Sequence, residues 1–344
     1  MFFVRIVLYL FYNIEFGLAC KDNDNHPVDW WYIYQPPSAA FSSQGSNVYI
    51  YITSESTDDA WTPGSNLYSK SMLQNTLAPI YNARRHDRYA ILVYDSPSNE
   101  SLARGVLLAR GGAGAWLVHT VPGLPDLNNP LVFPVNELRN GHLIACFSID
   151  LFSANDVAAL VRQANPKFKY ISIPEDMRDK LPLWNFKTVF TVGKSLKFLN
   201  ISTVNGMDLF SIVRGPGNHV CLYEAFAKNR NIILDVYGQT RGILSSSVCS
   251  NNYSVRNIAG LSIKFLETVF YVNNTHRDFA RFAVSTAAHW QKTGSAGPNV
   301  FWTCITTLSK EFNNSQGGII TCANHYDAWR SFDILKVKEP ECPR

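Results

Sequence analysis

Short runs of β-branched and aromatic residues recur along the chain, and most of them end at glycine, proline, asparagine or aspartate. Such residues suit a pleated, partly buried surface and such endings suit turns, so the pattern predicts β-strands. The predicted strands cover residues 47–53, 88–94, 105–108, 115–121, 142–148 and 231–237.

Three other segments carry apolar residues at helical spacing. They span residues 154–164, 221–228 and 324–332. Ser153 or Asn155 is expected to cap the first helix, because these side chains accept hydrogen bonds from free backbone N–H groups. Strands mixed with helices predict an α/β architecture. A charged, proline-containing stretch at 166–182 is the expected connection between two halves, 20–165 and 183–344.

Residues 1–19 have the composition of a secretory signal peptide, with an apolar run from Ile6 to Tyr12 and small residues before Cys20. Asn13 and Glu15 interrupt this run, which is therefore shorter than the roughly 20 residues of a membrane-spanning helix. We expect a secreted, extracellular protein with no membrane segment after signal cleavage. A lysosomal destination is the alternative.

The composition excludes a disordered chain, because 46% of the 344 residues are hydrophobic and only 17% are charged. A chain of this length can form one large domain or two smaller ones. The formal net charge of +4 and the isoelectric point near 8.6 permit attraction to nucleic acid. Secreted proteins of many functions share this charge, so charge alone does not identify a partner.

The seven cysteines show no Cys-x-x-Cys spacing, which favours disulfides over a zinc site and leaves one cysteine over. No metal site is expected. Five asparagines begin Asn-x-Ser/Thr sequons, which suits a glycoprotein of the secretory pathway. The expected glycosylation sites are Asn99, Asn200, Asn252, Asn273 and Asn313.

Several segments in both halves share residues and order with a known enzyme family. The first begins at Cys20 and contains Val28-Asp29-Trp30 ahead of an apolar stretch. The others are Gly105-Val106-Leu107-Leu108, the run from Trp116 to Pro125, Gly242-Ile243-Leu244 before Cys249, and Trp302-Thr303-Cys304 with Gln316-Gly317-Gly318, Cys322-Ala323 and Trp329. Over almost the whole mature chain these segments resemble the deoxyribonuclease II family of acid endonucleases.

The resemblance implies a phospholipase D-like fold, in which two pseudo-symmetric halves each contain a central β-sheet flanked by helices. In this family each half supplies a His-x-Lys unit to one site, and no metal or cofactor takes part. One histidine attacks phosphorus, the other protonates the leaving 5′ oxygen, and the lysines neutralise the phosphate. The family's disulfides would pair Cys20 with Cys146, Cys249 with Cys342 and Cys304 with Cys322, leaving Cys221 unpaired.

This chain departs from the family where the two His-x-Lys units are expected. It has Leu102-Ala103-Arg104 in the first block and Phe279-Ala280-Arg281 in the second. Leucine and phenylalanine can neither attack phosphorus nor carry a proton, so we expect nuclease activity to be lost or impaired. Arginine keeps the cation and suits phosphate oxygens, so Arg104 and Arg281 are the expected phosphate-binding residues and DNA is the expected partner.

Two alternatives remain. His119 lies on a predicted strand beside apolar residues, where a hydrogen-bonded core role is usual. An active acid endodeoxyribonuclease would instead have to use His119, or another histidine such as His289, for catalysis. A secreted interaction protein with no nucleic-acid role would use neither arginine for DNA, and the sequence does not identify its protein partner. A homodimer is compatible with the resemblance.

Overall fold

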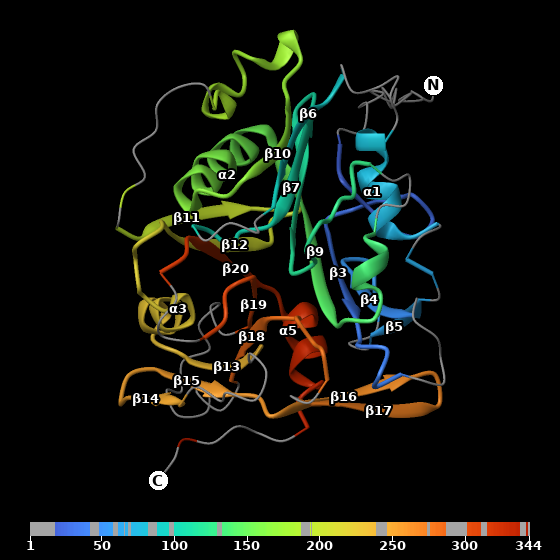
Figure 1. Cartoon of the computed structure of the whole chain (residues 1–344), viewed down its shortest axis with the longest axis vertical. Helices are drawn as coiled ribbons and strands as arrows, with labels where there is room; N and C mark the ends of the chain where they lie inside the picture. Colours follow the sequence, from blue (N-terminus) through green and yellow to red (C-terminus); the bar gives the residue numbers. More distant parts are fainter. Residues whose placement is uncertain are drawn as a thin grey trace, which may run out of the picture.

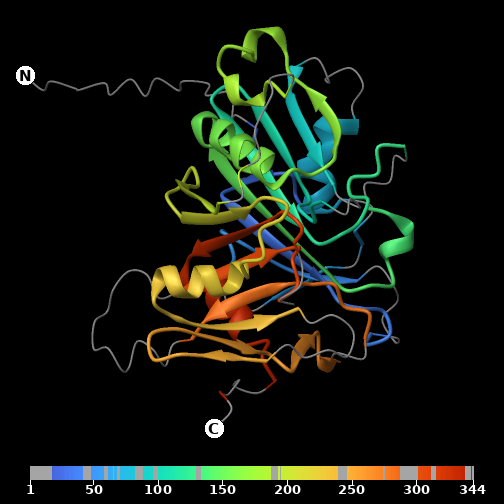
Figure 2. The same ribbon diagram turned by 60° about the vertical axis from the view of Figure 1, so that its left-hand side comes forward.

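The computed structural model of the chain is shown in Figures 1 and 2. The described residues are 18–41, 48–57, 61–64, 66–67, 70–81, 88–95, 100–128, 133–186, 193, 195–238, 246–273, 276–286, 301–310, 315–337 and 342. They form a mixed α/β structure with two eight-stranded sheets, which confirms the predicted fold class.

The first sheet is built from the N-terminal part of the chain. Its strands are β3 (Trp30–Gln35), β4 (Tyr49–Thr53), β5 (Thr62–Gly64), β6 (Ala90–Tyr94), β7 (Gly105–Arg110), β8 (Ala113–His119), β9 (His142–Asp150) and β10 (Phe168–Ser172). They lie in the order β10-β6-β7-β8-β9-β3-β4-β5, and neighbouring strands are antiparallel. β10 lies within the stretch 166–182, so part of that stretch is a strand of the first sheet.

The second sheet is built from the C-terminal part. Its strands are β11 (Lys197–Ser202), β12 (Asp208–Arg214), β13 (Ile233–Tyr237), β14 (Val248–Cys249), β15 (Ser254–Asn257), β18 (Phe282–Ser285), β19 (Trp302–Thr306) and β20 (Gly318–Asn324). Their order is β11-β12-β20-β19-β18-β13-β15-β14, with β13 and β15 parallel. Two smaller antiparallel sheets pair β1 (Cys20–Lys21) with β2 (Pro27–Val28), and β16 (Gly260–Phe265) with β17 (Thr268–Asn273).

Five neighbouring strands have the same arrangement in both sheets. The order β6-β7-β8-β9-β3 of the first sheet corresponds to β13-β18-β19-β20-β12 of the second, and all these neighbours are antiparallel. In both sheets the last strand of the set comes first along the chain. A helix directly follows β9 and another closely follows β20. The two sheets share this five-stranded order and differ at the next strand, because β10 is antiparallel to β6 whereas β15 is parallel to β13.

The helices lie between the sheets and on their outer faces (Figure 1). They are α1 (Met72–Tyr81), α2 (Leu151–Ala164), α3 (Leu222–Arg230) and α5 (Tyr326–Asp333). Buried residues of α2 and α5 belong to the core that both sheets share. Helix α1 packs in the apolar cluster on the other face of the first sheet, and α3 packs in the corresponding cluster of the second sheet.

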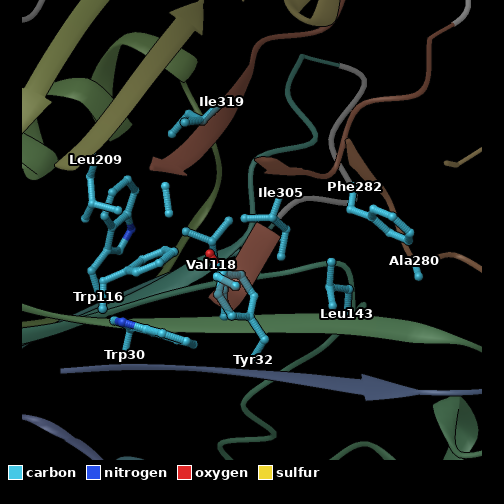
Figure 3. Packing of buried hydrophobic residues seen from close by; sticks show 14 of the residues in the cluster. Trp30, Tyr32, Trp116, Val118, Leu143, Leu209, Ala280, Phe282, Ile305 and Ile319 are labelled. Atoms are coloured by element: carbon cyan, nitrogen blue, oxygen red, sulfur yellow. The ribbon is translucent and has the colours of Figure 1, made fainter. Parts of the chain in front are cut away.

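The core between the sheets holds large aromatic side chains from both halves. Figure 3 shows Trp30, Tyr32 and Trp116 of the first sheet with Phe282 of the second. Phe332 of α5 joins the two halves, because its ring centroid lies 5.2 Å from that of Tyr32 and 4.9 Å from that of Phe282. Burial of such surfaces is the main stabilising term of the fold.

The predicted elements are present with shifted ends. All six predicted strands and all three predicted helices occur. The predicted cap of the first helix is wrong, because α2 starts earlier, at Leu151, and its N-cap is Asp150. Asp150 accepts a hydrogen bond from the backbone N–H of Ser153, and Asn155 instead accepts one from the N–H of Leu183.

The structure contains the three disulfides that the resemblance implied, Cys20–Cys146, Cys249–Cys342 and Cys304–Cys322. Cys221 is a free, partly buried thiol directly before α3. Each disulfide joins residues of one half. Among the described helices, none has the length and apolar character needed to cross a bilayer.

Candidate functional site

The two x-Ala-Arg tripeptides occupy corresponding positions in the repeated topology. Arg104 directly precedes β7 and Arg281 directly precedes β18, and these strands hold the same place in the two sheets. Ala103 and Ala280 are both buried in the core between the sheets, where Figure 3 shows Ala280. The similarity seen in the sequence therefore corresponds to an equivalent location in each sheet.

Each tripeptide is hydrogen-bonded to the opposite half of the molecule. The N–H of Leu102 donates to the carbonyl of Gly317 at 2.9 Å, and the N–H of Phe279 donates to the carbonyl of Gly141 at 2.8 Å. A Cβ atom at Gly141 would lie 2.3 Å from an oxygen of Asp278, so only glycine permits this approach. Both tripeptides thus lie at the junction of the two halves.

The two side chains at the expected histidine positions make apolar contacts. Leu102 is partly buried and packs against the cluster between the second sheet and α3. Phe279 is partly buried and stacks on His142, with 5.7 Å between the ring centroids and 26° between the planes. Neither side chain carries a nitrogen that could attack phosphorus or transfer a proton.

Arg104 belongs to a small cluster of charges. Its Nε donates to Asp95 Oδ1 at 3.0 Å, and Lys169 Nζ of β10 lies 2.7 Å from the other carboxylate oxygen. The N–H of Gly123 also donates to Asp95, at 2.8 Å. Burial would raise the pKa of Asp95, but the hydrogen bond from Lys169 and the neighbouring cations lower it overall. Two cations share this one carboxylate, so the three side chains together carry a positive charge.

Arg281 is held by the backbone of the second half. Its Nη1 donates to the carbonyl of Thr307 at 2.7 Å. The side chain passes over Gly238, which has φ of +133°, and a Cβ there would lie 2.7 Å from Arg281 Cγ. Glycine at position 238 therefore leaves the room that this arginine occupies.

His119 ends β8 beside Arg104 and is fully buried. Its predicted place in the core is confirmed. Neither ring nitrogen has a hydrogen-bond partner of good geometry in the described part of the chain, and the one polar contact of the ring is a weaker one with the backbone of Val121, which raises its pKa against the larger effect of burial. Burial lowers the pKa of His119 to about 3; the charge of Asp95 opposes this shift, and Arg104 and His142 reinforce it. The imidazole is therefore neutral even in mildly acidic solution.

His142 is a second buried histidine at the site, and the sequence reasoning missed it. It begins β9, and its Nε2 lies 2.9 Å from Glu137 Oε2. Its Nδ1 lies 3.4 Å from Thr120 Oγ1. Burial lowers the pKa of His142, against the opposing effect of Glu137. The sequence places this histidine only at the start of a predicted strand, and its stacking on Phe279 is a long-range contact.

Asp278, directly before Phe279, is the centre of a hydrogen-bond network between the sheets. Its Oδ2 accepts hydrogen bonds from the hydroxyls of Tyr34 at 2.6 Å and Tyr237 at 2.7 Å, and its Oδ1 accepts one from the N–H of Ala280 at 2.9 Å. Burial raises the pKa of Asp278, and these hydrogen bonds offset the shift only in part. The network fixes the backbone around the second tripeptide.

Cationic side chains and buried imidazoles meet near the two tripeptides. The described cations are two arginines and Lys169, whereas both described imidazoles are buried, and this burial lowers the pKa of each. His289 lies outside the described residues, as do the sequons at Asn99 and Asn313. The other three sequon asparagines are exposed: Asn200, Asn252 and Asn273.

One group of potential metal ligands occurs among the described residues, away from this site. Asp22, Asp24 and His26 lie in a turn between β1 and β2. Asp22 already accepts hydrogen bonds from the N–H groups of Asp24 and His26. These hydrogen bonds of the turn account for the closeness of the three side chains, so their arrangement does not require a metal.

Comparison with known proteins agrees with the sequence resemblance. The family model described as Deoxyribonuclease II matches residues 19–342. Human Deoxyribonuclease-2-beta is 24% identical over 348 residues, covering 94% of this chain and 92% of the relative. Cell-death-related nuclease 7 of Caenorhabditis elegans is 23% identical, covering 99% and 93%. Deoxyribonuclease-2-alpha of Sus scrofa is 24% identical, covering 94% and 90%.

Proposed function

The chain belongs to the deoxyribonuclease II family, and from this premise we propose that it is a secreted, deoxyribonuclease II-like protein that binds DNA phosphates without cleaving them. Two of these relatives are named as deoxyribonucleases and the third as a cell-death-related nuclease, which supports DNA as the ligand. Their mechanism is expected to need a histidine in each half, as the family resemblance implies. The disulfides are consistent with an extracellular or lysosomal location.

The observation that carries the proposal is the occupation of both histidine positions by apolar side chains. Leu102 and Phe279 stand at corresponding places before β7 and β18, and both pack against neighbouring groups. Loss of a nucleophile alone reduces the rate of such enzymes by several orders of magnitude, and here the proton donor is replaced as well.

Phosphate binding is supported by the retained cations. Arg104 and Lys169 share one carboxylate, that of Asp95, and Arg281 stands before β18 at the place that Arg104 holds before β7. Arginine at both places supplies a planar donor set for phosphate oxygens. A DNA strand held by such contacts should dissociate as salt rises, because bound counterions compete for the phosphates.

The loss of cleavage is tested by plasmid nicking at pH 5 in the presence of a chelator. We expect no nicking by the parent and gain of nicking by the double variant Leu102→His, Phe279→His. The matched control Leu102→Gln, Phe279→Gln introduces polar side chains without a nucleophile and should stay inactive. Nicking by the parent itself would overturn the proposed inactivity.

DNA binding is tested by titrating a labelled duplex at several salt concentrations. The Arg104→Ala, Arg281→Ala variant should bind at least tenfold more weakly and show a shallower salt dependence. The matched control is Arg110→Ala. Arg110 is the last residue of β7, the strand that Arg104 precedes, and it pairs with Asp176. Equal binding by the parent and the double variant would contradict a role of the two arginines. The absence of salt-dependent binding in all three proteins would favour a secreted interaction protein with no nucleic-acid role.

A second candidate is an active acid nuclease that uses the buried histidines. His119 and His142 both lie beside Arg104, which is the observation in its favour. Against it, both rings are fully buried, and a histidine with a pKa of about 3 is a poor proton donor at pH 5. This candidate predicts nicking by the parent that is abolished by His119→Phe or His142→Phe.

A further inference from the structure

Two equivalent backbone crossings join the halves beside the two tripeptides. At the first crossing, the N–H of Leu102 donates to the carbonyl of Gly317 at 2.9 Å, and the N–H of Gly317 donates to the carbonyl of Glu100 at 2.6 Å. The side chain of Glu100 is exposed, and its Oε2 accepts a hydrogen bond from Nδ2 of Asn165 at 2.8 Å. The first crossing thus presents a carboxylate to the solvent.

The second crossing repeats these hydrogen bonds with a cation in place of the carboxylate. The N–H of Phe279 donates to the carbonyl of Gly141, and the N–H of Gly141 donates to the carbonyl of Arg277, both at 2.8 Å. Arg277 therefore holds the place of Glu100, two residues before the position where the family resemblance implies a histidine. The side chain of Arg277 is exposed as well.

Arg139 adds a second cation to the second crossing. It lies two residues before Gly141, where the first crossing has Ser315. Its backbone carbonyl accepts a hydrogen bond from the N–H of Ser38 at 3.2 Å, and its side chain is exposed. Among the described residues, neither Arg139 nor Arg277 takes part in an ion pair. These two residues, the second-crossing arginines, therefore present two positive charges to the solvent.

The second crossing adjoins the charge cluster of Arg104. The ring of Phe279 stacks on that of His142. Burial lowers the pKa of His142, and the nearby positive charge of Arg104 adds to this effect. A carboxylate of the same neighbourhood, that of Glu137, lies 2.9 Å from His142 Nε2 and is engaged there. The second-crossing arginines therefore extend the group of cations that begins at Arg104.

We propose that the second-crossing arginines bind a phosphate of the same DNA that Arg104 holds, so that the DNA leaves the site over the second crossing and avoids the first. This inference rests on the proposed function, because it assigns further contacts to the same ligand. Exposed arginines attract the phosphate backbone whatever the base sequence, whereas the carboxylate of Glu100 repels it. The DNA is therefore held to one side, although the two halves share a strand order.

The second-crossing arginines are tested by titrating a labelled duplex at several salt concentrations. Arg139→Ala, Arg277→Ala should bind about fivefold more weakly, and its slope of log affinity against log salt should be shallower by about 2, roughly 1 for each lost phosphate contact. Arg139→Lys, Arg277→Lys keeps both charges and should keep the slope of the parent. The matched control Arg178→Ala, Lys180→Ala removes two exposed cations that follow the short 3-10 helix Glu175–Met177, and it should bind like the parent.

The outcomes separate this inference from the proposed function. Salt-dependent binding by the parent that is unchanged in the alanine pair would overturn the inference and leave the proposed function standing. A parent without salt-dependent binding would overturn both. The variants should melt at the temperature of the parent, because the substituted side chains are exposed and backbone hydrogen bonds hold the crossing.

The charge of the first crossing is tested in the same titration. Glu100→Arg gives the first crossing a cation and should bind the duplex about fivefold more tightly, with a steeper salt dependence. The control Asn165→Gly removes the hydrogen bond to Glu100 Oε2, keeps the carboxylate charge and suits the left-handed φ of 53° at this position, so it should bind like the parent. Equal binding by Glu100→Arg and the parent would contradict the repulsion assigned to Glu100.

Discussion

Phe279 stands where the family resemblance implies a histidine, in a segment whose backbone is held from both halves. Its backbone donates to Gly141, and Asp278 beside it holds Tyr34 and Tyr237, so the segment is fixed from both halves. Its ring stacks on His142, so the side chain at the expected histidine position makes an aromatic contact. A histidine introduced there would meet an already ordered backbone, which is why the gain-of-cleavage variant is a fair test.

His119 should make the protein less stable in acid. Its pKa is about 3 in the folded protein and about 6.5 in an unfolded chain, so the unfolded state binds an extra proton as the pH falls below 6.5. The folded state loses roughly 2 kcal/mol of stability from this group between pH 6.5 and pH 5. The variant His119→Leu should therefore show a flatter dependence of unfolding free energy on pH, measured by urea denaturation across this range.

The control for this prediction is Leu117→Ala, which truncates a buried side chain on the same strand. It should lower stability by about 2–5 kcal/mol at every pH and keep the slope of the parent. An unchanged slope in His119→Leu would mean that His119 takes up its proton in the folded state, contrary to its buried surroundings.

Local sequence motifs locate the candidate site, but they do not reveal the contacts that surround it. Leu102 and Phe279 stand within local motifs, so a short segment of sequence is enough to find them. Tyr34, Tyr237 and Asp278 meet only after two sheets have packed together, and no local pattern marks them. The pairing of Arg104 with Asp95 likewise depends on which strands become neighbours.

At the scale of elements, helix α2 offers a direct test of the corrected cap. Asp150 Oδ1 accepts the N–H of Ser153 at 2.6 Å, so Asp150→Ala should cost about 1 kcal/mol of unfolding free energy. The control Asp156→Ala removes the same charge from an exposed position within the helix and should cost less. Thermal or urea denaturation of both variants measures the difference, and equal losses would show that charge, rather than the cap, matters.

The elements that sequence patterns missed have identifiable causes. Helix α1 contains Pro79, which is unfavourable inside a helix and weakens its pattern, yet its buried side chains fix it on the first sheet. Strand β12 is buried along almost its whole length, so it lacks the alternation that marks a half-exposed strand. Both elements therefore form because of tertiary packing and not because of a local sequence pattern.

At the scale of the whole molecule, the two halves depend on each other through non-covalent contacts. No described disulfide joins them, but Asp29 near β3 accepts hydrogen bonds from Thr203 and Asn205 of the second half. Trp61 donates to the carbonyl of Ser331 at 2.8 Å. Together with the shared core, these contacts predict that the halves unfold as one unit although their topology repeats.

Phe226 tests this cooperativity, because its ring lies in the apolar cluster of α3 and the second sheet and contacts Phe210 and Trp302. Phe226→Ala should lower the free energy of unfolding by about 3–5 kcal/mol. Hydrogen exchange should report the same loss of opening free energy in β9 of the first half as in β20 of the second. Phe332 lies at the junction, so Phe332→Ala should lower the stability of both halves whether they unfold as one unit or as two. This variant serves as the reference. A loss confined to the second half in Phe226→Ala would show two independently stable domains, and the shared core would then be an interface between them.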